Sequence, residues 1–246
     1  MDLGLNGRTA IVCGASAGIG LGVAEALAEE GAHVVMFARR RDVLEREARR
    51  IGGLAVAGDV TSSSDAERLV ESAVAAFGGI DILVNNSSGP PRTTAAELEA
   101  AHVEAAVQLL LVSAVRLTGL CLPYLEHSPS GRIVNVTSSS VREPIDNLAL
   151  SNAVRPGVIG WAKTLARELG PTGITVNSIA PGRIDTERVR EVYPDGPTDA
   201  DLRAIPLRRL GRKREVGDVV AFLCSDRAAY VTGTVVLVDG GLTRGL

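Results

Sequence analysis

The stretch Gly14-Ala15-Ser16-Ala17-Gly18-Ile19-Gly20 decides the fold of this chain. It follows the apolar run from Thr9 to Cys13, which has the length and composition of a strand, and it opens a segment with helical periodicity. Glycines at a strand-to-helix turn allow a tight bend and let backbone N–H groups approach a pyrophosphate at the positive end of the helix. The stretch therefore predicts a dinucleotide-binding loop.

Strand-like and helix-like segments alternate along the rest of the chain. Short apolar runs predict strands at 9–13, 33–38, 54–58, 82–85, 131–137, 175–180 and 235–238. Helical periodicity lies between them, at about 18–30, 41–51, 64–77, 97–125, 151–169 and 215–223. Strands separated by helices pair in parallel, and almost wholly apolar strands are typical of a sheet with helices on both faces. The sequence therefore predicts an α/β fold, a doubly wound (Rossmann) sheet of about seven parallel strands, in a single domain over 1–246.

The bulk composition indicates a protein that works on a small molecule. The 246 residues carry a formal net charge of −3, with 46% hydrophobic and 22% charged residues. This balance gives no general attraction to nucleic acid or to an anionic membrane. The first residues lack the pattern of a signal peptide, and the apolar run 109–115 is too short to span a bilayer. We therefore expect a cytoplasmic protein with a small-molecule substrate and without nucleic acid or membrane as partners.

The three cysteines, Cys13, Cys121 and Cys224, are scattered through apolar runs. Their spacing is not that of metal ligands, and their odd number argues against a disulfide framework. We expect reduced core residues and no metal site.

Further motifs follow the predicted strands. They are Asp59-Val60, Asn85-Asn86, Gly131-Arg-Ile-Val-Asn-Val-Thr-Ser138, Pro181-Gly182, Thr232-Gly233 and Asp239-Gly240-Gly241. Together with the Gly-x-x-x-Gly-x-Gly spacing of the first stretch, they make nearly the whole chain resemble the short-chain dehydrogenase/reductase family. Within that family the chain looks like an atypical branch that resembles 3-oxoacyl-[acyl-carrier-protein] reductases.

The resemblance implies a nicotinamide dinucleotide at the carboxyl ends of the strands. The glycine stretch would hold the pyrophosphate, Asp59 and Val60 would contact the adenine, Asn86 the adenosine side, and residues 181–186 the nicotinamide and its amide. The cofactor-binding residues expected on this basis are Gly14, Ser16, Ala17, Gly18, Ile19, Gly20, Arg39, Arg40, Asp59, Val60, Asn86, Arg155, Pro181, Gly182, Ile184 and Thr186.

The second predicted strand ends in Ala38-Arg39-Arg40-Arg41. An NAD-selective site normally presents an acid to the ribose hydroxyls here, whereas arginine matches a phosphate in charge and geometry. The sequence therefore favours NADP(H) over NAD(H). Ala17 argues the other way, because many NADP-preferring relatives carry a base at that position, and Arg41 could simply cap the strand in solvent.

The expected catalytic positions depart from the family pattern. In the family a Ser orients the carbonyl oxygen, a Tyr passes the proton, a Lys holds the nicotinamide ribose, and an Asn supports a water relay. By spacing, these positions are Ser138, Ser151, Arg155 and Leu110 in this chain. A serine hydroxyl is too weak an acid to replace the phenol unaided, whereas Arg155 stays charged and can bind ribose hydroxyls or stabilise an oxyanion. We predict Ser138, Ser151 and Arg155 as the catalytic residues.

The sequence leaves the proton donor open. One candidate, Tyr193, lies in the region of about 186–212, where the family places a mobile substrate lid. The candidates are Glu143, Asp146, Tyr193, His102 reaching inward from the long helix, and water held by Ser138 and Ser151. For each of these side chains we favour an ordinary structural role over that of proton donor.

Three functions are compatible with these observations. The first is an NADP(H)-dependent oxidoreductase that interconverts a carbonyl and an alcohol through a non-standard site, on a ketoacyl-like or other mid-sized ketone. The second is a non-redox enzyme, such as a cyclase, dehydratase or isomerase, and the third is an NADP-binding protein without turnover. By resemblance we also expect a homotetramer or homodimer assembled through the two long helices.

Overall fold

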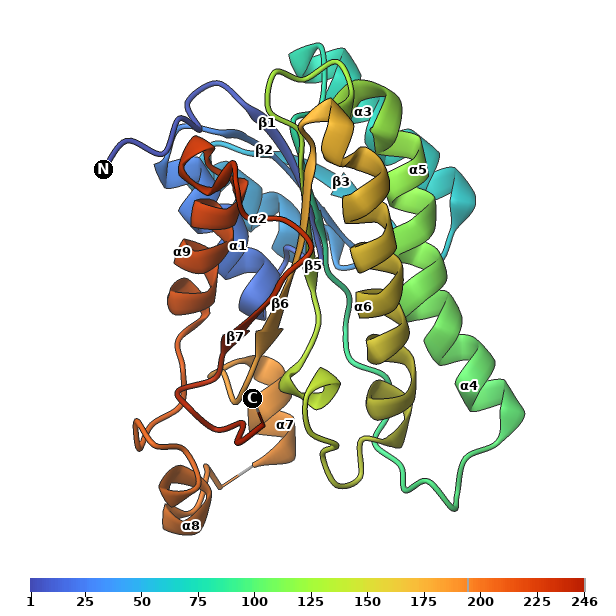
Figure 1. Ribbon diagram of the computed structural model, residues 1–246, viewed down its shortest axis with the longest axis vertical. Coiled ribbons are helices and arrows are strands. Elements are labelled where there is room, and N and C mark those ends of the chain that lie inside the picture. The colour runs from blue at the N-terminus through green and yellow to red at the C-terminus, as the bar shows by residue number, and fades with distance from the viewer. Residues whose placement is uncertain (194, 246) are drawn as a thin grey trace.

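The computed structural model describes residues 1–193 and 195–245 of the chain. Within this part, seven parallel strands form one sheet in the order β3-β2-β1-β4-β5-β6-β7 (Figure 1). The predicted doubly wound α/β fold is confirmed, and each predicted strand is present with its ends within one residue of those expected. The strands are β1 (Thr9–Cys13), β2 (His33–Ala38), β3 (Leu54–Ala57), β4 (Ile82–Asn85), β5 (Arg132–Val136), β6 (Thr175–Pro181) and β7 (Val235–Val238).

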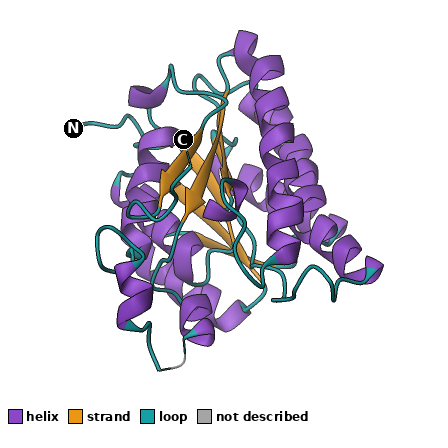
Figure 2. Cartoon of the chain, turned by 60° about the horizontal axis from the view of Figure 1, so that its bottom comes forward, coloured by secondary structure: helices purple, strands orange, loops and turns teal. Residues whose placement is uncertain are grey.

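Helices cover both faces of this sheet. In the described part of the chain they are α1 (Gly18–Glu29), α2 (Arg41–Ile51), α3 (Ser63–Phe77), α4 (Ala100–Val107), α5 (Ser113–Leu125), α6 (Ala149–Leu169), α7 (Glu187–Val192), α8 (Asp199–Arg203) and α9 (Lys213–Cys224). Helices α1, α2 and α9 lie on one face, and α3 to α6 lie on the other (Figures 1 and 2). Because side chains alternate along a strand, Val12 and Val34 join the first core layer while Ile11 and Val35 join the second.

A π-helical turn, Gln108–Val112, joins α4 and α5 into one long helix. The Ser113 hydroxyl donates a hydrogen bond to the carbonyl oxygen of Leu109 at 2.6 Å across this turn. By length and composition, the combined helix Ala100–Leu125, with 26 residues, is long and apolar enough to cross a membrane, although its apolar run 109–115 alone is not. In the fold, α5 packs against α3 and α4 packs against α6, yet only 39% of the apolar window is buried in the single chain.

The predicted lid region contains two short helices, α7 and α8, that the sequence analysis did not predict. Their five or six residues are too few for a recognisable helical period. A capping box starts α8, because the Thr198 hydroxyl accepts the N–H of Asp201 while the Asp201 carboxylate accepts the N–H of Thr198. Behind the helices, Ile205 is buried and the Leu207 N–H donates to the carbonyl oxygen of Gly240. The lid is therefore fixed to the segment that follows β7.

Candidate active site

The glycine turn after β1 forms a backbone cradle at the start of α1. Gly14 and Gly18 have φ angles of 62° and 56°, which glycine adopts far more readily than other residues. A Cβ atom on Gly20 would lie 2.2 Å from the carbonyl oxygen of Gly14. The turn leaves no room for a side chain here, so a ligand can approach the backbone N–H groups at the positive end of α1. This geometry fits the pyrophosphate of a dinucleotide.

A cleft of about 680 Å³ runs from this turn along the carboxyl ends of the strands. Its volume is within the usual range for a small-molecule site. Pro181, buried at the end of β6, does not line the cleft. The other predicted site residues do: Gly14, Ser16, Ala17, Gly18, Ile19, Gly20, Arg39, Arg40, Asp59, Val60, Asn86, Ser138, Ser151, Arg155, Gly182, Ile184 and Thr186.

Several lining residues were missed by the sequence analysis. Only five of them directly precede or follow a predicted residue, and that adjacency was the available signal; these five are Ala38, Gly58, Ser87, Thr137 and Glu187. Glu187 and Val189 come from α7, whose position only the folded chain defines. The missed residues are Ala38, Gly58, Ser87, Ser88, Gly89, Pro90, Leu109, Val136, Thr137, Leu148, Glu187 and Val189.

Two exposed arginines lie at the outer end of the cleft. Arg40 forms an ion pair with Glu187 at 3.0 Å, which joins the end of β2 to the lid. Arg39 lies near Asp59, whose carboxylate accepts hydrogen bonds from the N–H and the hydroxyl of Thr61. The hydrogen bond from the Thr61 N–H contributes most to holding the pKa of Asp59 below its usual range, despite its partial burial. The Thr61 hydroxyl and the positive charge of Arg39 lower this pKa further. This end therefore presents two cations and one ionised carboxylate.

A network of serines and one arginine forms the inner end. The Arg155 Nε–H donates to Ser151 Oγ at 3.1 Å, and Ser151 Oγ lies 3.1 Å from Ser140 Oγ. Arg155 Nη1 donates to the carbonyl oxygen of Val136 at 3.2 Å, and Ser138 Oγ accepts the N–H of Ser140 at 3.1 Å. Burial lowers the pKa of the Arg155 guanidinium to about 10, so it remains charged at neutral pH. Ser140, which no sequence motif indicated, completes this network.

The candidate proton donors are mostly engaged elsewhere. His102 is exposed on α4 and does not reach inward, which was one of the alternatives that the sequence left open. The Tyr193 hydroxyl donates to Asp201 Oδ1 at 3.2 Å, and burial raises the pKa of this phenol. Glu143 Oε1 accepts the N–H groups of Arg244 and Gly245, and Asp146 is exposed.

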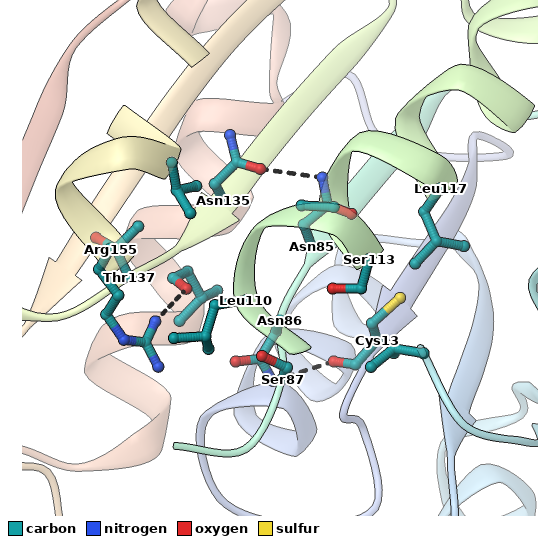
Figure 3. Close-up of a pocket in the computed structure, with 14 residues that line it drawn as sticks. Cys13, Asn85, Asn86, Ser87, Leu110, Ser113, Leu117, Asn135, Thr137 and Arg155 are labelled. Atoms are coloured by element: carbon teal, nitrogen blue, oxygen red, sulfur yellow. Dashed lines mark hydrogen bonds between the residues drawn. The ribbon is translucent and has the colours of Figure 1, made fainter. Parts of the chain in front are cut away.

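A small cavity of about 20 Å³ lies behind Arg155, with room for one water molecule (Figure 3). Leu110, Ser113 and two buried asparagines border it. Asn85 Nδ2 donates to Asn135 Oδ1 at 3.0 Å, while Asn85 Oδ1 and Asn135 Nδ2 are buried without a partner among the described residues. Leu110 offers this cavity no polar atom, so a water there would bind the asparagine amides.

Comparison with known proteins places the chain in a family. A family model described as enoyl-(acyl carrier protein) reductase matches residues 14–243. The chain is also 36% identical to the 3-oxoacyl-[acyl-carrier-protein] reductase of Vibrio cholerae over 98% of its own length and 99% of that protein's. The chain belongs to the short-chain dehydrogenase/reductase family. Among other members, the pig (Sus scrofa) dehydrogenase/reductase SDR family member 4 is 34% identical, over 96% of this chain and 88% of that protein.

Solved structures of this reductase family superpose closely on the chain. The L-sorbose reductase of Gluconobacter frateurii, complexed with NADPH and L-sorbose, aligns with a TM-score of 0.92 and 34% identity over the full length of both chains. An NADPH-bound short-chain oxidoreductase of Pseudomonas aeruginosa, described as containing an atypical catalytic center, aligns with a TM-score of 0.91 and 30% identity, over 97% of this chain and 98% of that chain. The fold seen here is therefore that of the family.

Replacing Ser151 with alanine should destabilise the protein. The substitution removes the acceptor of the buried Arg155 Nε–H, and an unsatisfied buried donor costs about 1–3 kcal/mol. Urea denaturation followed by circular dichroism would measure the loss in the free energy of unfolding. Ser63→Ala, at an exposed serine of α3, is the control and should change this energy by less than about 0.5 kcal/mol. Equal stability of the two variants would contradict the role assigned to Ser151.

Proposed function

We propose that this protein is an NADP(H)-dependent oxidoreductase that interconverts a carbonyl and an alcohol through a non-standard active site. One observation carries the proposal: a single cleft joins the glycine cradle and Arg39 and Arg40 at one end to Ser138, Ser151 and Arg155 at the other. The first group suits a phosphorylated dinucleotide, and the second suits a polarised carbonyl oxygen.

The preference for NADP(H) over NAD(H) rests on the end of β2. Arg39 and Arg40 line the cleft where an acid would otherwise meet the ribose hydroxyls. Both are exposed, so a phosphate can reach them, and the Arg40 ion pair with Glu187 is of the exposed kind that contributes only about 0–1 kcal/mol. The NADPH bound in the L-sorbose reductase structure supports this preference. The NADH bound in a related 3-ketoacyl-(acyl-carrier-protein) reductase of Brucella melitensis supports a nicotinamide dinucleotide but not the preference for its phosphorylated form.

The inner end would bind and polarise the substrate carbonyl. NADPH, when bound, would supply the hydride for the carbonyl carbon and would become NADP⁺. The hydroxyls of Ser138 and Ser151 and the charge of Arg155 stabilise the negative oxygen that forms, and this oxygen takes its proton from water. Loss of a positioned general acid removes about 10²- to 10⁴-fold in rate, so we expect slow but measurable reduction.

The absence of a positioned proton donor among the described residues also supports the two other functions compatible with the sequence, a non-redox enzyme and an NADP-binding protein without turnover. With Tyr193 bonded to Asp201 and Glu143 to the C-terminal segment, the site could instead position a substrate for a non-redox reaction or bind NADP(H) without turnover. Arg155 would serve charge stabilisation in the first case. Substrate-dependent oxidation of NADPH distinguishes the reductase from both of these alternatives.

The arginines at the end of β2 should control the choice of cofactor. The double variant Arg39→Ala/Arg40→Ala should weaken NADPH binding by at least about 100-fold, because two charge-assisted contacts of about 1.5–3 kcal/mol each are lost. NADH binding should change less than about threefold, since NADH carries no 2′-phosphate. Fluorescence titration measures both, with Arg41→Ala, whose side chain pairs with Glu45 on α2, as the control. Equal losses for NADPH and NADH would refute the preference.

Substrate-dependent oxidation of NADPH tests the activity itself. Purified protein is mixed with NADPH and a panel of ketones, oxo acids and ketoacyl thioesters, and absorbance at the nicotinamide band is followed. We expect slow oxidation with at least one substrate, and a gain of about 10²-fold or more in the double variant Ser151→Tyr/Arg155→Lys, which adds a proton donor. Binding of NADPH without oxidation in either protein would favour the non-redox enzyme or the NADP-binding protein.

We also propose a homotetramer or homodimer that covers the long helix. Much of the apolar surface of Ala100–Leu125 is uncovered in the single chain, and Val115 on α5 is 42% exposed. Light scattering should give a mass of two or four chains, and Val115→Arg should lower it, whereas Ala76→Arg on the exposed side of α3 should not. A single-chain mass for the unaltered protein would refute this assembly.

A further inference from the structure

Arg155 is a buried cation with neutral partners. Its side chain is on a residue only 8% exposed, and its described hydrogen bonds go to the Ser151 hydroxyl and the Val136 carbonyl oxygen. No carboxylate pairs with it in the described ranges 1–193 and 195–245. Its remaining N–H groups therefore have no acidic partner within the described chain.

Arg132, the other buried arginine of the described chain, has a carboxylate near its guanidinium. Arg132 is 2% exposed, and its Nη2 lies 3.8 Å from the carboxylate of Asp226. Burying an unpaired guanidinium costs several kcal/mol, and a nearby carboxylate offsets part of that cost. Arg132 has this compensation from the protein itself, whereas Arg155 does not.

The surroundings of Arg155 in the cleft are rich in hydrogen-bond donors. The acidic side chains that line the cleft are Asp59, bonded to Thr61, and Glu187, paired with Arg40 at the outer end. Ser138 and Ser151 line the cleft with Arg155, and a serine hydroxyl can donate a hydrogen bond as well as accept one. The inner end is therefore set up to receive negative charge from a ligand.

A nicotinamide ribose would not supply this charge. Its hydroxyls are neutral, so they can accept hydrogen bonds from Arg155 but leave the buried charge uncompensated. A carboxylate would do both, because the planar guanidinium matches its two oxygens in charge and in geometry.

We propose that the substrate is an oxo acid and that Arg155 binds its carboxylate, which lies on the reacting carbonyl carbon or one carbon away from it. The Ser138 and Ser151 hydroxyls beside Arg155 then orient the carbonyl oxygen of the same molecule. This inference rests on the proposed function and names its substrate class. Arg155 is thereby a specificity-determining residue that discriminates oxo acids from neutral ketones and esters.

Calorimetric titration with carboxylates that resemble oxo acids but cannot be reduced tests the inference without turnover. The probes are oxamate and malonamate, each compared with its neutral diamide, oxamide or malonamide, in the presence and absence of NADPH. We expect at least one carboxylate to bind at least about tenfold more tightly than its diamide, because the diamide lacks the charge that Arg155 compensates. Equal affinities for both pairs would overturn the proposal, and this comparison needs no variant.

Two variants locate the binding at Arg155. Arg155→Met should weaken carboxylate binding by at least about tenfold, and Arg155→Lys should retain part of it because the charge remains. The control Arg142→Met removes an exposed arginine of the loop before α6 and should leave the affinity unchanged. Unaltered carboxylate affinity in a folded Arg155→Met protein would also overturn the proposal.

The outcomes separate this inference from the proposed function. Oxidation of NADPH with neutral ketones, without carboxylate binding, would leave the reductase standing and remove the oxo acid. Carboxylate binding at Arg155 without NADPH binding would keep the anion site and remove the reductase.

Discussion

The close approach of Gly20 to the carbonyl oxygen of Gly14 is the constraint on which the rest of the site depends. The contact fixes the start of α1 directly above the end of β1, in the middle of the sheet. Asn86 strengthens it, because its Nδ2 donates to the Cys13 carbonyl oxygen at 3.1 Å and ties the end of β4 to the same turn. Since β1 and β4 are neighbours whose connections leave on opposite faces, a crevice opens between them. Each other part of the site lines this crevice.

The two ends of the cleft hold their cations under different physical conditions. At the outer end Arg40 is exposed and its ion pair with Glu187 is screened by water, so a ligand can replace the carboxylate at little cost. At the inner end Arg155 is out of water, where the same charge interacts far more strongly with whatever lies beside it. The outer end is therefore suited to exchange one anion for another, and the inner end is suited to discriminate between ligands by charge.

The lid stabilises itself with groups that could otherwise take part in proton transfer. Arg183 lies 5.9 Å from the centre of the Tyr193 ring, and Asp201 accepts the Tyr193 hydroxyl while also capping α8. Polar side chains that satisfy one another in this way hold the lid in one arrangement. Tyr193 and Asp201 are therefore engaged with each other, and the proposed chemistry relies on water and the serine hydroxyls at the inner end instead.

The sequence by itself determined the strands, their parallel pairing, the glycine turn, and many of the residues at the carboxyl ends of the strands. These features are local, because a strand period, a glycine turn or a motif is written in a few adjacent residues. Only the tertiary structure decided that Glu187 meets Arg40 across 147 positions of sequence, that Ser140 joins Ser151, and that His102 faces solvent. It also decided that Arg155 is buried without a carboxylate from the described chain, since burial and pairing depend on which distant segments are brought together.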